Sequence, residues 1–69
     1  MMSTRVEAEF QDEVKNRYND ATGIVIAKYH HSNSSMRIDV RSASGEKIFY
    51  GSPIENWEVV RTAEERGQL

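Results

Sequence analysis

Residues 36–41 read Met-Arg-Ile-Asp-Val-Arg and alternate apolar and charged side chains for three full periods. This period of two predicts a β-strand with one buried face and one solvated face. Upstream, residues 23–29 read Gly-Ile-Val-Ile-Ala-Lys-Tyr, are rich in β-branched side chains and follow a turn signal at 19–23. Downstream, residues 47–50 read Lys-Ile-Phe-Tyr and follow a Ser-Gly pair that suits a tight hairpin. Together these segments predict a three-stranded antiparallel meander.

Each end of the chain has both a helical and a strand interpretation. Apolar residues at a spacing of four and a Thr-x-x-Glu capping box favour a helix over 4–18, whereas 6–10 and 14–18 also alternate as strands do. A serine cap followed by proline favours a helix over 53–66. The aromatic and β-branched stretch Trp-Glu-Val-Val at 57–60 favours instead a strand that follows one turn of 3-10 helix.

Two stretches resemble KOW- and Tudor-type SH3-like barrels over residues 12–61. The acidic-x-apolar start Asp-Glu-Val at 12–14, followed by Tyr-Asn-Asp-Ala-Thr-Gly-Ile-Val at 18–25, resembles their opening. The stretch 50–60 resembles their close, where a short 3-10 turn precedes the last strand. The resemblance implies a mainly β, SH3-like small barrel of about five antiparallel strands, with a 3-10 turn near 53–56. The alternative is an α+β arrangement of helix, three-stranded antiparallel meander and helix.

The chain of 69 residues has room for one small domain, 1–69, whose ordered core we place at 12–61 with ends that are flexible or helical. The barrel interpretation assigns the core to Val14, Ile24 or Val25, Ile26, Ile38, Val40, Ile48, Tyr50, Ile54, Trp57 and Val59. It leaves Val25, Phe49 and Val60 on the outer face, where they would form a patch for another subunit to cover. The chain has no cysteine, so disulfide bonds cannot stabilise so small a core. We therefore expect self-association to supply additional stability.

Charge and hydropathy limit the classes of partner. The net charge is -2 and the isoelectric point is about 5.6, whereas dedicated nucleic-acid-binding domains usually lie above about 9. The middle of the chain, 14–52, is mildly basic and both ends are acidic. No apolar run approaches the roughly 20 residues that span a bilayer, and no signal peptide is visible. We therefore expect a cytoplasmic protein that does not bind membranes.

No catalytic, phosphate-binding or metal-binding motif is present, so we expect neither an enzyme nor a cofactor or metal. The adjacent pair His30-His31 is interpreted as a solvated strand end, because neighbours on a strand point to opposite faces. Ser32, Ser34 and Ser35 follow the histidines, but the sequence shows no set of N–H donors that would stabilise an oxyanion. We therefore do not interpret these serines as catalytic nucleophiles. The adjacent carboxylates at 12–13 and at 64–65 are interpreted as surface charges.

Aromatic and basic side chains give the best candidates for a binding surface, since aromatic rings stack on bases, cations or proline rings. The ligand-binding candidates are Tyr18, Arg37, Arg41, Tyr50 and Trp57. Tyr18, beside a turn, is the most exposed candidate by position, whereas Tyr50 and Trp57 are also assigned to the core. Arg37 and Arg41 share a strand face with Asp39, which favours an Arg-Asp ladder with neighbouring strands over an anion site.

These observations predict a small non-enzymatic binding or adaptor module that acts through its surface as a homo-oligomer. A protein partner fits the acidic isoelectric point best. One alternative is an oligomeric protein that sequesters a small anionic ligand in an interfacial pocket, with Tyr18, Arg37 and Arg41 as contacts. The other is a nucleic-acid-binding small barrel, which the resemblance and the basic centre favour.

Overall fold

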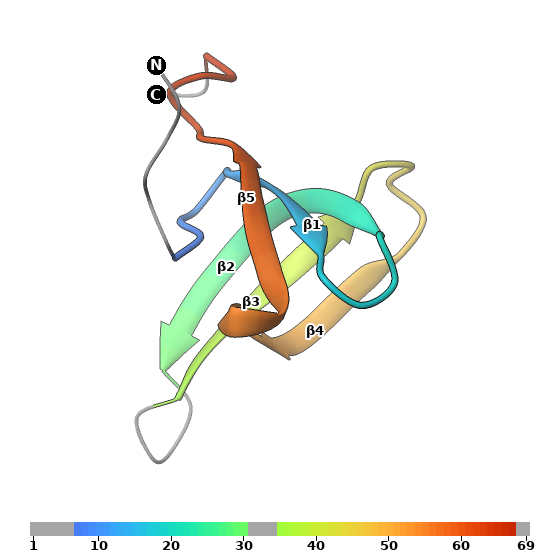
Figure 1. The fold of residues 1–69 in the computed structure, drawn as a ribbon, viewed down its shortest axis with the longest axis vertical. Coiled ribbons are helices and arrows are strands. Elements are labelled where there is room, and N and C mark those ends of the chain that lie inside the picture. The colour runs from blue at the N-terminus through green and yellow to red at the C-terminus, as the bar shows by residue number, and fades with distance from the viewer. Residues whose placement is uncertain (1–6, 31–34, 68–69) are drawn as a thin grey trace.

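The computed structural model describes residues 7–30 and 35–67, and nearly all of its regular structure is β-strand. Its elements are β1 (Glu13–Asn16), β2 (Thr22–His30), β3 (Met36–Ser42), β4 (Ile48–Pro53), the 3-10 turn η2 (Ile54–Asn56) and β5 (Trp57–Arg61). Figure 1 shows β2 as a long curved strand, with β5 passing in front of it. The sheet thus bends over on itself and encloses the core on its inner face.

The strands form one antiparallel sheet in the order β4-β3-β2-β1-β5. The predicted meander is confirmed, because β2 pairs with β3 and β3 pairs with β4. The C-terminal stretch also forms a strand, and β5 pairs with β1. The expected mainly β fold of five antiparallel strands with a 3-10 turn near 53–56 is therefore confirmed, and the α+β alternative is wrong. Within 7–30 and 35–67, no pairing joins β4 to β5, so these two strands are the sheet edges.

Pro53 directs the chain from β4 into η2. Its φ of -58° suits the start of a helical turn, and it has no N–H with which to continue the sheet. The turn is short, because Trp57 already has an extended backbone and donates its N–H to the carbonyl oxygen of Ile54. The proline-led helix signal therefore gives one turn of 3-10 helix, after which β-branched residues form β5.

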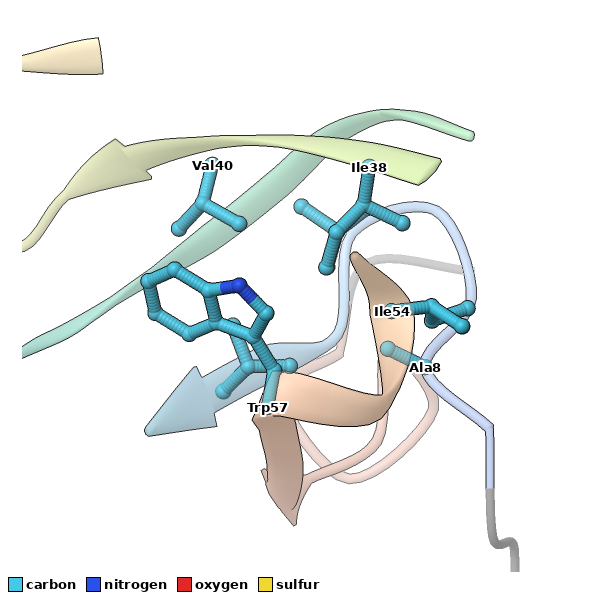
Figure 2. Packing of buried hydrophobic residues seen from close by; sticks show 7 residues of the cluster. Ala8, Ile38, Val40, Ile54 and Trp57 are labelled. Atoms are coloured by element: carbon cyan, nitrogen blue, oxygen red, sulfur yellow. The ribbon is translucent and has the colours of Figure 1, made fainter. Parts of the chain in front are cut away.

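The core lies between the two halves of the bent sheet (Figure 2). Trp57 fills its centre: its ring meets the Phe49 ring edge-on, with centroids 5.5 Å apart, and its Nε1–H donates to Ser52 Oγ at 2.8 Å. The buried hydrophobic cluster consists of Ala8, Val14, Val25, Ile38, Val40, Ile54 and Trp57, with Met36, Phe49 and Val59 packed against it. Because Ala8 belongs to this cluster, the packed region begins before residue 12.

The predicted core needs correction in β2 and β4, because Ile24, Ile26 and Ile48 are half-buried and lie outside the buried cluster. Val25 is fully buried and Phe49 packs on the core, whereas Tyr50 is 75% exposed. The cause in β4 is a bulge: the register passes from Val40–Phe49 to Ile38–Ser52, so two β4 residues face one β3 residue. With Val25 and Phe49 directed inward, the expected outer patch is reduced to Val60, which is 49% exposed.

The segment before β1 is joined to the segment after β5 through Asp12, which is fully buried. Its two carboxylate oxygens accept the backbone N–H groups of Glu9 and Ala63, each at 2.8 Å. Thr62 and Glu65 form a reciprocal capping box on the turn at 62–67. The interpretation of Asp12 as a surface charge is therefore wrong: it connects the N-terminal segment to the C-terminal turn, which lie near each other in Figure 1.

Both helical interpretations of the ends are wrong where the structure describes them. Residues 4–6 of the expected helix over 4–18 lie outside the described residues, and its later part contains β1. In place of a helix over 53–66, the structure has η2, β5 and then the turn at 62–67. The proline at 53 begins only the single turn η2, which has no side-chain cap hydrogen bond. Thr4 of the N-terminal capping signal lies outside the described residues.

Candidate functional site

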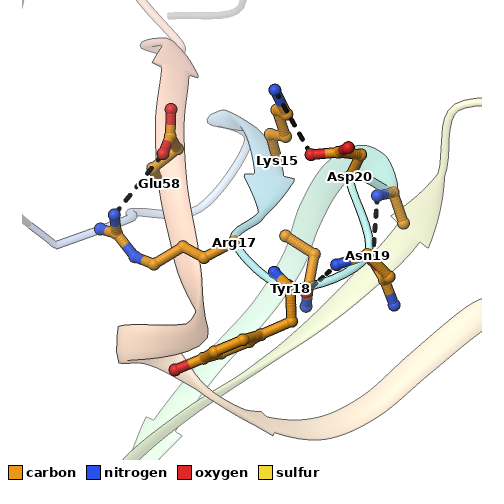
Figure 3. Close-up of polar contacts among 8 residues, drawn as sticks. Lys15, Arg17, Tyr18, Asn19, Asp20 and Glu58 are labelled. Atoms are coloured by element: carbon orange, nitrogen blue, oxygen red, sulfur yellow. Dashed lines mark hydrogen bonds and ion pairs between the residues drawn. The ribbon is translucent and has the colours of Figure 1, made fainter.

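The β1–β2 loop, residues 17–21, is held in place by the buried side chain of Asn16. The Oδ1 of Asn16 accepts the backbone N–H groups of Tyr18 at 2.9 Å and Asn19 at 3.2 Å (Figure 3). The Oδ1 of Asn19 accepts the N–H of Ala21 at 2.9 Å, and the N–H of Asn16 donates to the carbonyl oxygen of Ala21 at 2.7 Å. Because the loop satisfies these donors internally, these hydrogen bonds favour one backbone conformation.

Arg17 fastens the same loop to η2 and β5. Its Nε donates to the carbonyl oxygen of Glu55 at 3.0 Å, and Nη2 donates to that of Trp57 at 3.4 Å. Its Nη1 also forms an ion pair with Glu58 at 3.5 Å. These contacts join residues about forty positions apart in the chain and leave the guanidinium partly exposed.

Tyr18 is the side chain that this fastened loop presents to solvent, with 79% of its surface exposed. Figure 3 shows its ring on the opposite side of the loop from the ion pair between Lys15 and Asp20, whose Nζ and Oδ1 atoms lie 3.5 Å apart. The backbone at Asp20 has a φ of +62°, a left-handed conformation that aspartate tolerates better than most residues. The structure thus combines an exposed aromatic ring with an ordered backbone.

A second polar cluster joins β2, β3 and β4 around Asp39. The Oδ1 of Asp39 accepts the Tyr29 hydroxyl at 2.9 Å and the Gly51 N–H at 2.8 Å. Arg37 Nη1 donates to the Gly51 carbonyl oxygen at 2.8 Å, while its buried Nε has no hydrogen-bond partner among the described residues. The backbone of Gly51 has a φ of +59°. The cluster thus caps the β4 bulge. The expected Arg-Asp ladder is absent among the described residues, because Arg37 donates to the Gly51 carbonyl oxygen and Asp39 accepts from Tyr29 and Gly51.

Two side chains on β2 have raised pKa values. The hydrogen bond to Asp39 raises the pKa of Tyr29 above its ordinary 10.0, and desolvation adds to this. For Lys28, desolvation lowers the pKa, but the hydrogen bonds and charges of Glu9 and Glu7 outweigh it and raise the pKa above 10.5. Lys28 Nζ lies 2.8 Å from Glu9 and 3.3 Å from Glu7, so it holds the N-terminal segment against β2. Both groups have structural partners.

The structure does not bring the five ligand-binding candidates together. Trp57 is 1% exposed and offers no surface to a ligand. Tyr18 lies beside the start of β2. Arg37 lies opposite Tyr29, near the end of β2. Arg41 and Tyr50 are exposed on β3 and β4. Of the five, only Tyr18 combines high exposure with a loop fixed by side-chain hydrogen bonds.

The residues that position Tyr18 were not among the sequence candidates. Asn16 and Arg17 directly precede it, and the signal that could have identified them is the clustering of Asn and Asp side chains over 16–20. Such side chains form hydrogen bonds with backbone groups two or three residues further on. The sequence marked the turn but did not show which residue fixes it.

The histidine pair is described in part. His30 is exposed at the end of β2, as expected of a solvated strand end, and His31 lies outside the described residues. Across 7–30 and 35–67, no three His, Cys, Asp or Glu side chains gather as metal ligands. The same residues contain no helix with the length and apolar character needed to cross a bilayer.

Comparison with protein-family models, curated proteins and solved structures finds no match for this chain.

Proposed function

We propose that this chain is a small, non-enzymatic binding module that contacts a partner protein through its β1–β2 loop, with Tyr18 as the central contact. The observation that carries the proposal is the exposure of 79% of Tyr18 on a loop whose backbone is fixed by Asn16. Tyrosine is enriched among the residues that dominate protein interfaces. A loop that is already ordered loses less conformational entropy on binding.

The charges around Tyr18 support a protein partner over a nucleic acid. The two cations nearest to it in the chain, Lys15 and Arg17, are each paired with a carboxylate, of Asp20 and of Glu58. A surface of mixed sign gives little of the counterion release that drives binding to phosphates. Mixed charges around an aromatic residue are typical of the rim of a protein interface.

The proposal is tested by affinity capture with three versions of the immobilised protein: wild type, Tyr18→Ala and Tyr50→Ala. Tyr50 is a matched control because it is also a tyrosine, is 75% exposed and lies on β4. We expect a protein retained by the wild type and by Tyr50→Ala but lost with Tyr18→Ala. Calorimetry with the purified partner should then show that Tyr18→Ala weakens binding about tenfold or more, which corresponds to about 1.4 kcal/mol.

Other outcomes contradict the proposal. If Tyr18→Ala and Tyr50→Ala weaken binding equally, the β1–β2 loop is not the contact surface. If the protein instead binds a single-stranded RNA or DNA probe and the affinity falls steeply with added salt, the chain is a nucleic-acid-binding barrel. A small molecule that raises the Tm of the pure protein and competes with the captured partner would support the sequestering alternative.

A further inference from the structure

The free edge of β5 differs from the free edge of β4 in how well it is protected against pairing with another strand. In β4, Pro53 lacks an N–H, and the N–H and C=O groups of Gly51 are both bonded to β3 side chains. The strand β5, Trp57–Arg61, contains neither proline nor glycine, and among the described residues it pairs with β1 alone. One of its backbone groups has a side-chain partner, the carbonyl oxygen of Trp57, which accepts Arg17 Nη2 at 3.4 Å. Its exposed edge includes Val60, which is 49% exposed.

A bulge in β5 places two opposite charges on the same face. Glu58 pairs with Lys15 and Arg61 pairs with Glu13, while the register shifts by one residue between these pairs. Val60 is the extra residue. In a regular strand, positions three apart point to opposite faces, but the extra residue restores Glu58 and Arg61 to one face.

The charges on this outer face alternate in two rows across β1 and β5. One row contains Lys15 followed by Glu58, and the next contains Glu13 followed by Arg61. The second row includes a direct ion pair, with Arg61 Nε 2.9 Å from Glu13 Oε1. At the free edge, the rows therefore end in Glu58, which also pairs with Arg17 of its own chain at 3.5 Å, and in Arg61.

We propose that two copies of this chain pair antiparallel through β5, around a two-fold axis at Val59 and Val60. In this register Glu58 faces the partner's Arg61, and Arg61 faces the partner's Glu58. Each row then continues with alternating sign across the axis: Lys15, Glu58, the partner's Arg61, the partner's Glu13. A two-fold axis makes the edge complementary to itself, as a symmetric dimer requires.

The same geometry limits how strongly the copies associate. Opposite charges on directly facing strand positions stabilise pairing, and Val60 becomes covered by the partner. However, β5 has five residues, and its bulge interrupts the regular spacing of backbone groups. The dimer is therefore a weak one that forms and dissociates with protein concentration. The edge does not include Tyr18, but Glu58 also pairs with Arg17, which fastens the β1–β2 loop. Arg61→Glu leaves that ion pair in place, so it is the variant that separates the dimer from the proposed loop contact.

The test is sedimentation velocity over about 10 µM to about 1 mM, the range in which weak association is visible. The samples are the wild type, Glu58→Arg, Arg61→Glu and an equimolar mixture of these two variants. Each single variant places like charges opposite one another in a homodimer. In the mixture, one chain has only basic and the other only acidic side chains at the two facing positions. We expect the wild type to dimerise, each variant alone to remain monomeric, and the mixture to form a heterodimer.

Matched controls separate this edge from general charge effects. Glu46→Arg and Arg41→Glu make the same charge changes at exposed positions outside β5, and both should dimerise as the wild type does. Tyr18→Ala should also dimerise, so the two proposals can fail separately. A wild type that is monomeric up to about 1 mM overturns the inference. So does a dimer that persists in either single variant, or a mixture of the variants that stays monomeric although both are folded by circular dichroism.

Discussion

Replacing Asp12 by alanine is expected to cost about 3 kcal/mol or more of unfolding free energy. The carboxylate is fully buried and accepts two backbone N–H groups at 2.8 Å, from Glu9 and from Ala63. A hydrogen bond to a charged group contributes about 1.5–3 kcal/mol, and alanine leaves both donors without this acceptor. Since a domain of this size has a total stability of roughly 3–5 kcal/mol, Asp12→Ala should lose most of its stability and unfold at much lower urea than the wild type.

Trp57 gives the assay for this prediction, because it is the single tryptophan and is 1% exposed in the folded state. Urea unfolding followed by its fluorescence should place Asp12→Asn between the wild type and Asp12→Ala, since the amide keeps one acceptor oxygen. Glu13→Ala is the matched control, since it removes the neighbouring carboxylate and an exposed ion pair with Arg61, at a cost of at most about 1 kcal/mol. If Asp12→Ala and Glu13→Ala cost the same, Asp12 does not join the segments before β1 and after β5.

Three further changes test the packing and the polar contacts. Gly23→Ala should cost about 2–3 kcal/mol, because the added Cβ would collide with the Arg41 carbonyl oxygen; an unchanged Tm would contradict this. Ser52→Ala should cost about 1 kcal/mol in urea unfolding, since the indole N–H of Trp57 loses its acceptor; equal stability would argue against that bond. The raised pKa of Tyr29 makes a contribution to stability that is complete below pH 10.0 and is lost as the pH rises through the folded-state pKa. Tyr29→Phe should therefore flatten the decline of Tm at alkaline pH. It should also remove the last step from the absorbance titration of the tyrosine phenolates, and an unaltered titration would contradict the Asp39 contact.

Local patterns in the sequence predicted the central meander, but they left both ends open between helix and strand and did not show the packing at irregular points. Alternation over residues 36–41 predicted β3 and its inward side chains Ile38 and Val40, and the aromatic and β-branched stretch favoured β5. Alternation failed in β4, because a bulge at a glycine with positive φ reverses which side chains point inward. A bulge depends on pairing with a neighbouring strand, and a single strand's sequence does not encode it clearly.

At the candidate site, too, the sequence predicted what depends on local pattern but not what depends on contacts formed in the folded structure. The exposure of Tyr18 followed from its place beside a turn signal, whereas the role of Asn16 depends on hydrogen bonds that form only once the loop is closed. The role of Asp12 depends on Ala63, which is about fifty residues away in the chain. Long-range contacts of this kind leave no periodic pattern, so adjacent acidic residues were interpreted as solvated charges.

The central claim is that the β1–β2 loop presents Tyr18 on a backbone that is already ordered before any partner binds. Backbone ¹⁵N relaxation of the free protein tests this directly at residues 17–21. The hydrogen bonds from the loop to Asn16 and Asn19 predict order parameters of about 0.85, equal to those of the strands. Values below about 0.6 in this loop would contradict the claim, because Tyr18 would then be carried by a flexible segment.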